Sequence, residues 1–267
     1  MSDFNRPRKS LGQNFLQDTD FQSKIVGGLG DLNNYDKIVE IGPGRGALTD
    51  HLLRSGKDII IIEFDSDLAQ FWRNLDKPNL TVIESDVLKV NFADFLDEND
   101  RNAIIGNIPY NITSPIIFKI LEEKRFFKRS VLMIQKEVAD RVVSKEGSRI
   151  YGILSIMVQI EAIATNLFMV PNTAFYPIPK VDSSVICLDF ENFVMPDIKN
   201  RKLFVNIMKT AFGQRRKMMR SSLKAKLKEL NYSGDMDLTR RPESLSVEEF
   251  VIFTNELDVS KSFSDNE

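Results

Sequence analysis

The sequence has few of the side chains that most often carry metal and hydrolytic chemistry: its 267 residues include one cysteine and one histidine. A single cysteine excludes an intramolecular disulfide. One cysteine and one histidine are also too few ligands for a Cys/His zinc site, which needs three or four. A Ser-His-Asp mechanism would rest on His51 alone, which lies in a helix-like stretch and is interpreted as structural. Cys187 lies in an apolar run and is interpreted as a core thiol. We therefore expect no metal.

Long apolar runs are also lacking. No run reaches the roughly 18 residues that a membrane-spanning helix needs, and residues 1–10 lack the apolar core of a signal peptide. We expect a cytoplasmic monomer with no membrane partner. The net charge of -2 argues mildly against a nucleic-acid partner, but the distribution of charge decides this more than its sum does.

Apolar runs alternate with helical patterns through the first two-thirds of the chain. Residues 58–63 include four consecutive isoleucines, which is typical of a parallel strand buried on both faces. The alternation predicts an α/β fold with a parallel sheet. Ser66 is the expected N-cap of one helix. Strands are expected at residues 37–41, 58–63, 80–83, 103–106, 130–135 and 181–190, and helices at 47–55, 66–74, 115–124, 136–144 and 150–162.

After Phe190 the pattern changes. Residues 191–200 are polar, which predicts a linker. From Arg201 onward the apolar residues have helical spacing. Ser246 precedes Glu249 by three residues, a capping box that predicts a last helix over residues 246–257. The sequence thus predicts two domains, residues 1–190 around the sheet and a small all-helical domain at residues 191–267.

A glycine-rich motif, Glu-Ile-Gly-Pro-Gly-Arg-Gly at residues 40–46, follows the first expected strand and opens a helix. Glycines permit a tight turn and close approach of a ligand, and the helix N-terminus offers free N–H groups. The Gly-x-Gly-x-Gly spacing differs from that of dinucleotide folds and disfavours a nicotinamide oxidoreductase. By itself the motif is equally compatible with a plain turn.

Two acids end the next strands. Glu63 lies where Rossmann-like sheets place an acid on ribose hydroxyls, and Asp86 could accept from an adenine amino group. Alternatively, Glu63 is a solvent-facing carboxylate and Asp86 a helix cap. Together with the glycine motif they are more specific, because ligands bind at the carboxyl ends of parallel strands.

Asn107, Ile108, Pro109 and Tyr110 follow the fourth expected strand. An adenine N6 amine is a weak nucleophile, because its lone pair is delocalised into the ring. The Asn107 side chain and the Ile108 carbonyl could accept its N–H groups, while Pro109 restricts the residue before it. Tyr110 could stack on the base. The alternative is a simple turn, since Asn-x-Pro is common in loops.

These motifs resemble the small-subunit (16S) rRNA adenine N6,N6-dimethyltransferase A family over roughly residues 8–257. The resemblance is carried by Gly-Gln-Asn-Phe-Leu at 12–16, by residues 40–49 and 106–112, by Phe-Tyr-Pro-Ile-Pro-Lys-Val-Asp-Ser at 175–183, and by Phe-Gly-Gln-Arg-Arg-Lys at 212–217. It implies a Rossmann-like class I methyltransferase sheet that uses S-adenosyl-L-methionine. The implied product is dimethylation of two adjacent adenines in the hairpin loop near the 3′ end of small-subunit rRNA, within a pre-30S particle.

The resemblance also implies residue roles. The residues implied to contact the cofactor are Asn14, Leu16, Gly42, Glu63, Asp86 and Asn107. The residues implied to meet the target amine are Asn107, Ile108 and Tyr110, with Phe175 stacking on the base from the other side. The family usually has proline where this chain has Ile178, which puts the rigidity of that loop in doubt.

Cations gather in the C-terminal third. Arg215, Arg216, Lys217 and Arg220 are the expected RNA contacts, because lysine and arginine neutralise phosphates. A solvated helix face is the alternative. The basic residues Arg6, Arg8 and Lys9 could form a second contact.

Two other functions stay open on the sequence alone: a macrolide-resistance-type methyltransferase on large-subunit rRNA, and a non-catalytic assembly or transcription factor that uses the same fold. The cationic segment resembles the housekeeping branch more than the resistance branch. The intact cofactor residues argue against a purely non-catalytic role.

Overall fold

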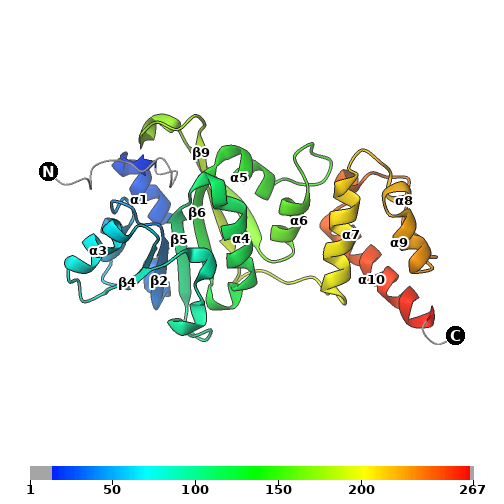
Figure 1. The fold of residues 1–267 in the computed structure, drawn as a ribbon, viewed down its shortest axis with the longest axis horizontal. Coiled ribbons are helices and arrows are strands. Elements are labelled where there is room, and N and C mark those ends of the chain that lie inside the picture. Colours follow the sequence, from blue (N-terminus) through cyan, green and yellow to red (C-terminus); the bar gives the residue numbers. More distant parts are fainter. Residues whose placement is uncertain (1–13, 265–267) are drawn as a thin grey trace. The chain divides into compact units, whose positions relative to one another are not determined.

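A computed structural model of the chain describes residues 14–264, with side chains described through Asp258. The chain forms two compact units (Figure 1). The first contains the described residues up to Ala139 together with Ala162–Phe193, and the second contains Asp140–Glu161 and the chain from Val194. The sequence placed residues 140–161 with the sheet. They belong with the helices because Tyr151, Ile156 and Ile160 are buried in the helical core.

The first unit is built on a seven-stranded sheet in the order β4-β3-β2-β5-β6-β9-β7. The strands β4, β3, β2, β5 and β6 run parallel to one another. Their bounds, with those of the last two strands, are β2 (Lys37–Ile41), β3 (Asp58–Glu63), β4 (Leu80–Glu84), β5 (Asn102–Asn107), β6 (Arg129–Gln135), β7 (Ile163–Val170) and β9 (Ser183–Asp189).

The predicted parallel sheet has one exception, the strand β9. β9 pairs antiparallel with both β6 and β7. A parallel partner needs a crossover of a dozen or more residues, usually a helix. The connection from β7 to β9 contains only short turns and the two-residue strand β8, so β9 returns antiparallel beside β7. The sequence pattern predicts no strand over the residues of β7.

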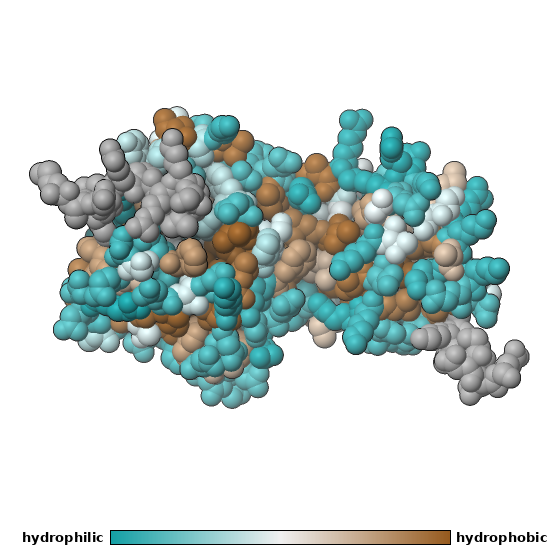
Figure 2. Space-filling view, in the orientation of Figure 1, coloured by the Kyte–Doolittle hydropathy of each residue, from teal (hydrophilic) through white to brown (hydrophobic). Residues whose placement is uncertain are grey.

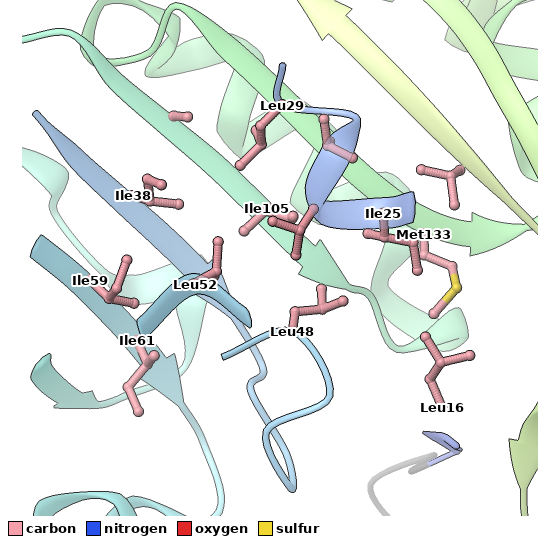
Figure 3. Packing of buried hydrophobic residues seen from close by; sticks show 14 of the residues in the cluster. Leu16, Ile25, Leu29, Ile38, Leu48, Leu52, Ile59, Ile61, Ile105 and Met133 are labelled. Carbon is pink, nitrogen blue, oxygen red and sulfur yellow. The ribbon is translucent and has the colours of Figure 1, made fainter. Parts of the chain in front are cut away.

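Helices pack against this sheet and close its core. Three isoleucines of the strands, Ile38, Ile59 and Ile105, are at most 1% exposed. Figure 3 shows them beside Leu48 and Leu52 of the α2 region and Ile25 of α1. Each fully buried side chain of this size contributes about 1.5–3 kcal/mol. The helices are α1 (Thr19–Gly27), α2 (Thr49–Leu53), α3 (Ser66–Asn74), α4 (Thr113–Glu122) and α5 (Lys136–Val142).

Two smaller expectations have clear outcomes. The N-cap of α3 is Asp65, whose carboxylate accepts from the Asp67 amide at 3.1 Å, and Ser66 is the first helical residue instead. Cys187 is buried within the sheet-side core, as expected, and burial raises the pKa of its thiol. The thiol is therefore inert at neutral pH.

A second, two-stranded sheet joins β1 (Phe15–Leu16) to β8 (Phe175–Tyr176), antiparallel. The Gln17 amide extends the pairing by donating to the Ala174 carbonyl at 2.9 Å. Nothing in the sequence periodicity indicated this pairing. The pairing holds the residues directly after Asn14 against a segment about 160 residues later in the sequence, since Leu16 pairs with Phe175.

The second unit is all-helical, as the sequence predicted for the C-terminal segment. Its helices are α6 (Ile153–Gln159), α7 (Arg201–Gly213), α8 (Met219–Ser222), α9 (Lys224–Glu229) and α10 (Val247–Ser264). The core contains Phe204, Phe250 and Phe253, each 0% exposed. The last helix continues past residue 257, where the sequence expected it to end. Within residues 14–264, no helix is long and apolar enough to cross a membrane.

The capping box at the start of α10 is confirmed. The Glu249 amide donates to Ser246 Oγ at 3.2 Å, and the Ser246 amide donates to Glu249 Oε2 at 2.8 Å. Two main-chain N–H groups that the helix itself leaves without partners are thereby satisfied.

We predict that Ser246→Ala lowers the free energy of unfolding by about 1 kcal/mol, because it removes the side-chain acceptor of this box. Urea unfolding followed by circular dichroism measures the change. Ser221→Ala, at an exposed position of α8, is the control and should lie within experimental error of the parent chain. Equal losses for both substitutions would contradict a specific capping role.

Candidate active site

A cavity of about 470 Å³ opens at the carboxyl ends of β2, β3, β4 and β5. Parallel strands bring their carboxyl ends to one edge of the sheet, so segments far apart in sequence meet there. The predicted site residues that line it are Asn14, Leu16, Gly42, Glu63, Asp86, Asn107, Ile108, Pro109 and Tyr110. His51 lies in α2 and does not line the cavity.

The glycine motif between β2 and α2 forms one wall. Gly44 and Gly46 have φ of +54° and +92°, a region that favours glycine. A Cβ on Gly46 would lie 2.7 Å from the ring of Trp72, whose Nε1 donates to the Gly44 carbonyl at 3.1 Å. The plain-turn alternative does not account for the open cavity on the other side of the loop.

Glu63 joins the end of β3 to this loop. Its side chain is 6% exposed, Oε2 accepts from the Gly44 amide at 3.2 Å, and Oε1 accepts from the Asp65 amide at 2.9 Å. Burial raises the pKa of Glu63. The carboxylate is therefore not the solvent-facing group of the alternative interpretation.

Asp86 is the helix cap that the sequence offered as an alternative, and its role toward an adenine stays a prediction. One oxygen, Oδ1, accepts from the Leu88 amide at 3.0 Å and caps the short 3-10 helix η4 (Val87–Lys89). The same residue lines the cavity. A cap fixes the carboxyl group at the end of β4, and the second oxygen remains available as an acceptor.

Glu40 lines the same cavity, although the sequence indicates it only as part of the glycine motif. It is 1% exposed. Burial, together with the nearby charges of Glu63 and Asp50, raises the pKa of Glu40 to about 8. An acid in the penultimate position of a strand, next to the buried apolar residues Ile38, Val39 and Ile41, was the sequence signal that could have marked it.

Asn107 is the last residue of β5, and its orientation is set by the main chain of Asn14. Asn107 Nδ2 donates to the Asn14 carbonyl at 3.2 Å. A carbonyl only accepts, so the amide nitrogen must face it. The Asn107 Oδ1 then points away from Asn14 and remains an acceptor.

Ile108 and Pro109 contribute through the main chain. The Ile108 side chain is 1% exposed, and its amide donates to the Met133 carbonyl at 3.0 Å. The Pro109 carbonyl accepts from Thr113 Oγ1 at 3.2 Å. These bonds hold the turn after β5 against β6 and the start of α4.

Tyr110 follows at the cavity wall, in the 3-10 helix η6 (Tyr110–Ile112). Its hydroxyl lies 2.7 Å from Ser183 Oγ. Burial raises the pKa of the phenol, so the hydroxyl stays neutral at physiological pH.

Phe175 differs from the expectation. It is 3% exposed, belongs to the sheet-side core and does not line the cavity. Successive residues of a strand point to opposite faces, so Tyr176 is the exposed member of β8, at 54%. The structure brings together the other predicted residues of the first unit, and the stacking role of Phe175 stays a prediction.

The predicted RNA contacts lie in the second unit, whose visible surface is mostly hydrophilic (Figure 2). Arg215, Arg216 and Lys217 lie between α7 and α8, and Arg220 lies in α8. Arg216, Lys217 and Arg220 are exposed, and none forms an ion pair with another described residue. Arg215 is different, because its guanidinium donates to the Ser148 carbonyl at 3.2 Å and faces Glu243 at 3.9 Å. The basic residues at positions 6, 8 and 9 lie outside the described residues.

The sequence matches the family model for ribosomal RNA adenine dimethylase over residues 4–257. The chain belongs to this family. It is a methyltransferase with the class I fold that the sequence predicted.

Curated relatives support the assignment along the whole chain. "Ribosomal RNA small subunit methyltransferase A" of Leptothrix cholodnii is 42% identical over 97% of this chain and 94% of its own length. The protein of the same name from Chlorobium phaeobacteroides is also 42% identical, over 94% and 93%.

Solved structures agree. A dimethyladenosine transferase from Plasmodium falciparum matches with a TM-score of 0.75 and 26% identity, over 92% of this chain and 98% of its own. The 23S rRNA methyltransferase ErmE matches with a TM-score of 0.67 and 23% identity, over 91% and 99%. At that identity the second match supports the fold alone.

The buried acid of this dimethylase site gives a pH prediction. The pKa of Glu40 is higher in the folded chain, about 8, than in the unfolded chain, about 4.5. The folded state thus keeps the proton longer, and its stability falls as pH rises from about 4.5 to about 8. Glu40→Gln cannot ionise, so its melting temperature should rise relative to the parent chain across that range and then level off.

Thermal unfolding at pH 5, 6.5, 8 and 9 measures the difference. Glu122→Gln, at an exposed position of α4, is the matched control and should show no such trend. Parallel pH curves for Glu40→Gln and the parent chain would show that Glu40 ionises normally.

Proposed function

We propose that this enzyme transfers four methyl groups from S-adenosyl-L-methionine to two adjacent adenines in the hairpin loop near the 3′ end of small-subunit (16S) rRNA. The substrate is a pre-30S particle in the cytoplasm, and the enzyme acts as a monomer. The observation that carries the proposal is the single cavity that places the glycine loop and Glu63 beside Asn107 and Tyr110. The names of the curated relatives support the choice of small-subunit rRNA.

The cavity fits the proposed cofactor. Glu63 is a buried carboxylate at a strand end, suited to ribose hydroxyls, and Asp86 suits an adenine amino group. A Cβ on Gly42 would meet no atom nearer than the Asn107 carbonyl at 3.9 Å, so the loop leaves open space there. Asn14 and Leu16 close the same wall. When bound, S-adenosyl-L-methionine supplies an electrophilic methyl group on a sulfonium.

Asn107 and Ile108 prepare the amine. Asn107 Oδ1 and the Ile108 carbonyl accept the two N–H groups of the adenine amine, which frees its lone pair from the ring. Pro109 keeps the Ile108 carbonyl extended, and Tyr110 stacks on the base. The amine becomes acidic once methylated, so no strong base is required. Positioning and preorganised hydrogen bonds supply the catalysis.

The second unit supplies the RNA contact. Arg216, Lys217 and Arg220 are exposed cations on adjacent turns, suited to phosphates of a folded RNA. Arg215 is the fourth proposed contact, but its bonds to Ser148 and Glu243 limit it to a supporting role. A hairpin-loop adenine can be extruded at lower cost than a paired one, which suits this active site.

The proposal predicts that the protein, incubated with undermethylated small subunits and labelled S-adenosyl-L-methionine, forms N6,N6-dimethyladenine at the two adjacent positions. Asn107→Ala should lose at least about a hundredfold in turnover, because it removes an acceptor that acts on the reacting amine. Mass spectrometry of the digested rRNA measures both results.

The melting temperature and the circular dichroism spectrum serve as controls for the fold of Asn107→Ala. Label in naked large-subunit RNA and none in small subunits would contradict the proposed substrate and favour the resistance-type activity. Wild-type turnover by Asn107→Ala would remove Asn107 from the mechanism.

The phosphate contacts give a salt prediction. The double variant Arg216→Ala, Lys217→Ala should bind small-subunit RNA more weakly, and the slope of log affinity against log salt should fall by roughly 1.4–1.8, since two phosphate contacts are lost. Fluorescence anisotropy at several salt concentrations measures it. Arg54→Ala with Lys77→Ala removes the same charges from exposed positions of the first unit and is the control. Equal slopes for the two double variants would locate the RNA elsewhere.

A further inference from the structure

Tyr110 is bonded to a serine that no part of the proposed mechanism uses. The Tyr110 hydroxyl and Ser183 Oγ are 2.7 Å apart, although 73 residues separate them in the chain. Ser183 is the first residue of β9 and is 0% exposed. It lies directly after the connection from β7, which ends at Asp182.

Ser183 is held firmly by the sheet. Its main chain pairs with Gln135 of β6 on one side and with Val170 of β7 on the other. Next to it, the Lys136 amide donates to the Asp182 carbonyl at 3.0 Å. A strand paired on both sides is among the least mobile parts of a fold. The hydroxyl of Ser183 is thus a fixed point beside the cavity.

Tyr110 is held at its other end by the main chain. Its carbonyl accepts from Thr113 Oγ1 at 3.3 Å. A tyrosine side chain has only two rotatable bonds. With the carbonyl end and the hydroxyl end both bonded, the direction of the Cγ–Oη axis is fixed, and with it the position of the ring at the cavity wall. Because burial raises the pKa of the phenol and keeps it neutral, the hydrogen bond joins two neutral hydroxyl groups. The bond therefore acts by holding the tyrosine in place.

We propose that Ser183 is a positioning residue for methyl transfer: its hydroxyl fixes the position of the Tyr110 ring, on which the target adenine stacks. This inference rests on the proposed function of Tyr110. It assigns to the buried serine a role in turnover and none in cofactor binding.

A double-mutant cycle tests the assignment. Ser183→Ala and Tyr110→Phe each remove one partner of the same bond, so each should lower kcat roughly two- to tenfold, the range expected of one neutral hydrogen bond. The double variant should lose no more than either single variant, because the bond can be lost only once. The dissociation constant of S-adenosyl-L-methionine should stay within about twofold of the parent value by calorimetry.

Ser184→Ala is the matched control. Ser184 is also buried, at 1% exposure, but it points to the other face of the sheet, and its Oγ has no hydrogen-bond partner among the described residues. Its substitution should leave kcat unchanged. If Ser184→Ala loses as much kcat as Ser183→Ala, both losses reflect the general packing of β9, and the proposal is overturned.

The remaining outcomes are also decisive. Wild-type kcat in Ser183→Ala would overturn the positioning role. So would a loss of kcat in the double variant equal to the product of the two single losses, because the two substitutions would then act independently. If Ser183→Ala does not fold, Tyr110→Phe alone decides, since wild-type kcat there shows that the bond does not matter. Tyr110→Ala distinguishes the stacking role of Tyr110 from the positioning role of Ser183. If Tyr110→Ala loses turnover while Tyr110→Phe does not, the stacking role is supported and the positioning role is overturned. Wild-type turnover by Tyr110→Ala would instead remove Tyr110 from the proposed function.

Discussion

The hydrogen bond from the Gly44 amide to the buried Glu63 carboxylate joins the ends of two parallel strands, and the active-site cavity is organised around it. The glycine loop leaves β2 in a conformation that other residues rarely adopt, so it needs an acceptor to hold its amides. Glu63 provides that acceptor from the neighbouring strand, and its second oxygen binds the Asp65 amide at the start of α3. One carboxylate therefore fixes the loop, the strand end and the following helix together.

The turn after β5 depends in the same way on distant segments. Asn107 is oriented by the Asn14 carbonyl, and Tyr110 is bonded to Ser183. Asn14 precedes β1, and Ser183 follows the segment that contains β8, the partner of β1. The two-stranded sheet thus connects the two supports of the turn after β5. Such a turn can be rigid without a long hydrophobic core of its own, because its polar groups are satisfied from both sides.

The elements with strong local signals were predictable. The four isoleucines of β3 predicted the bounds of that strand and the capping box predicted the start of α10, since burial on both faces and capping act within a few residues. β7 was missed because its side chains alternate weakly and most are exposed at the sheet edge. β1 and β8 have two residues each, too few for any periodicity to register.

The sequence by itself determined the chemistry of this protein: which acids end which strands, the glycine spacing, and the Asn-Ile-Pro-Tyr turn, because residue types and short-range order set what each group can accept or donate. Only the tertiary structure decided how those groups are used. It buried Phe175 and exposed Tyr176, and it tied Arg215 to Ser148 and Glu243. It also raised the pKa of Glu40. Burial and long-range hydrogen bonds are properties of the packed chain, and no local pattern encodes them.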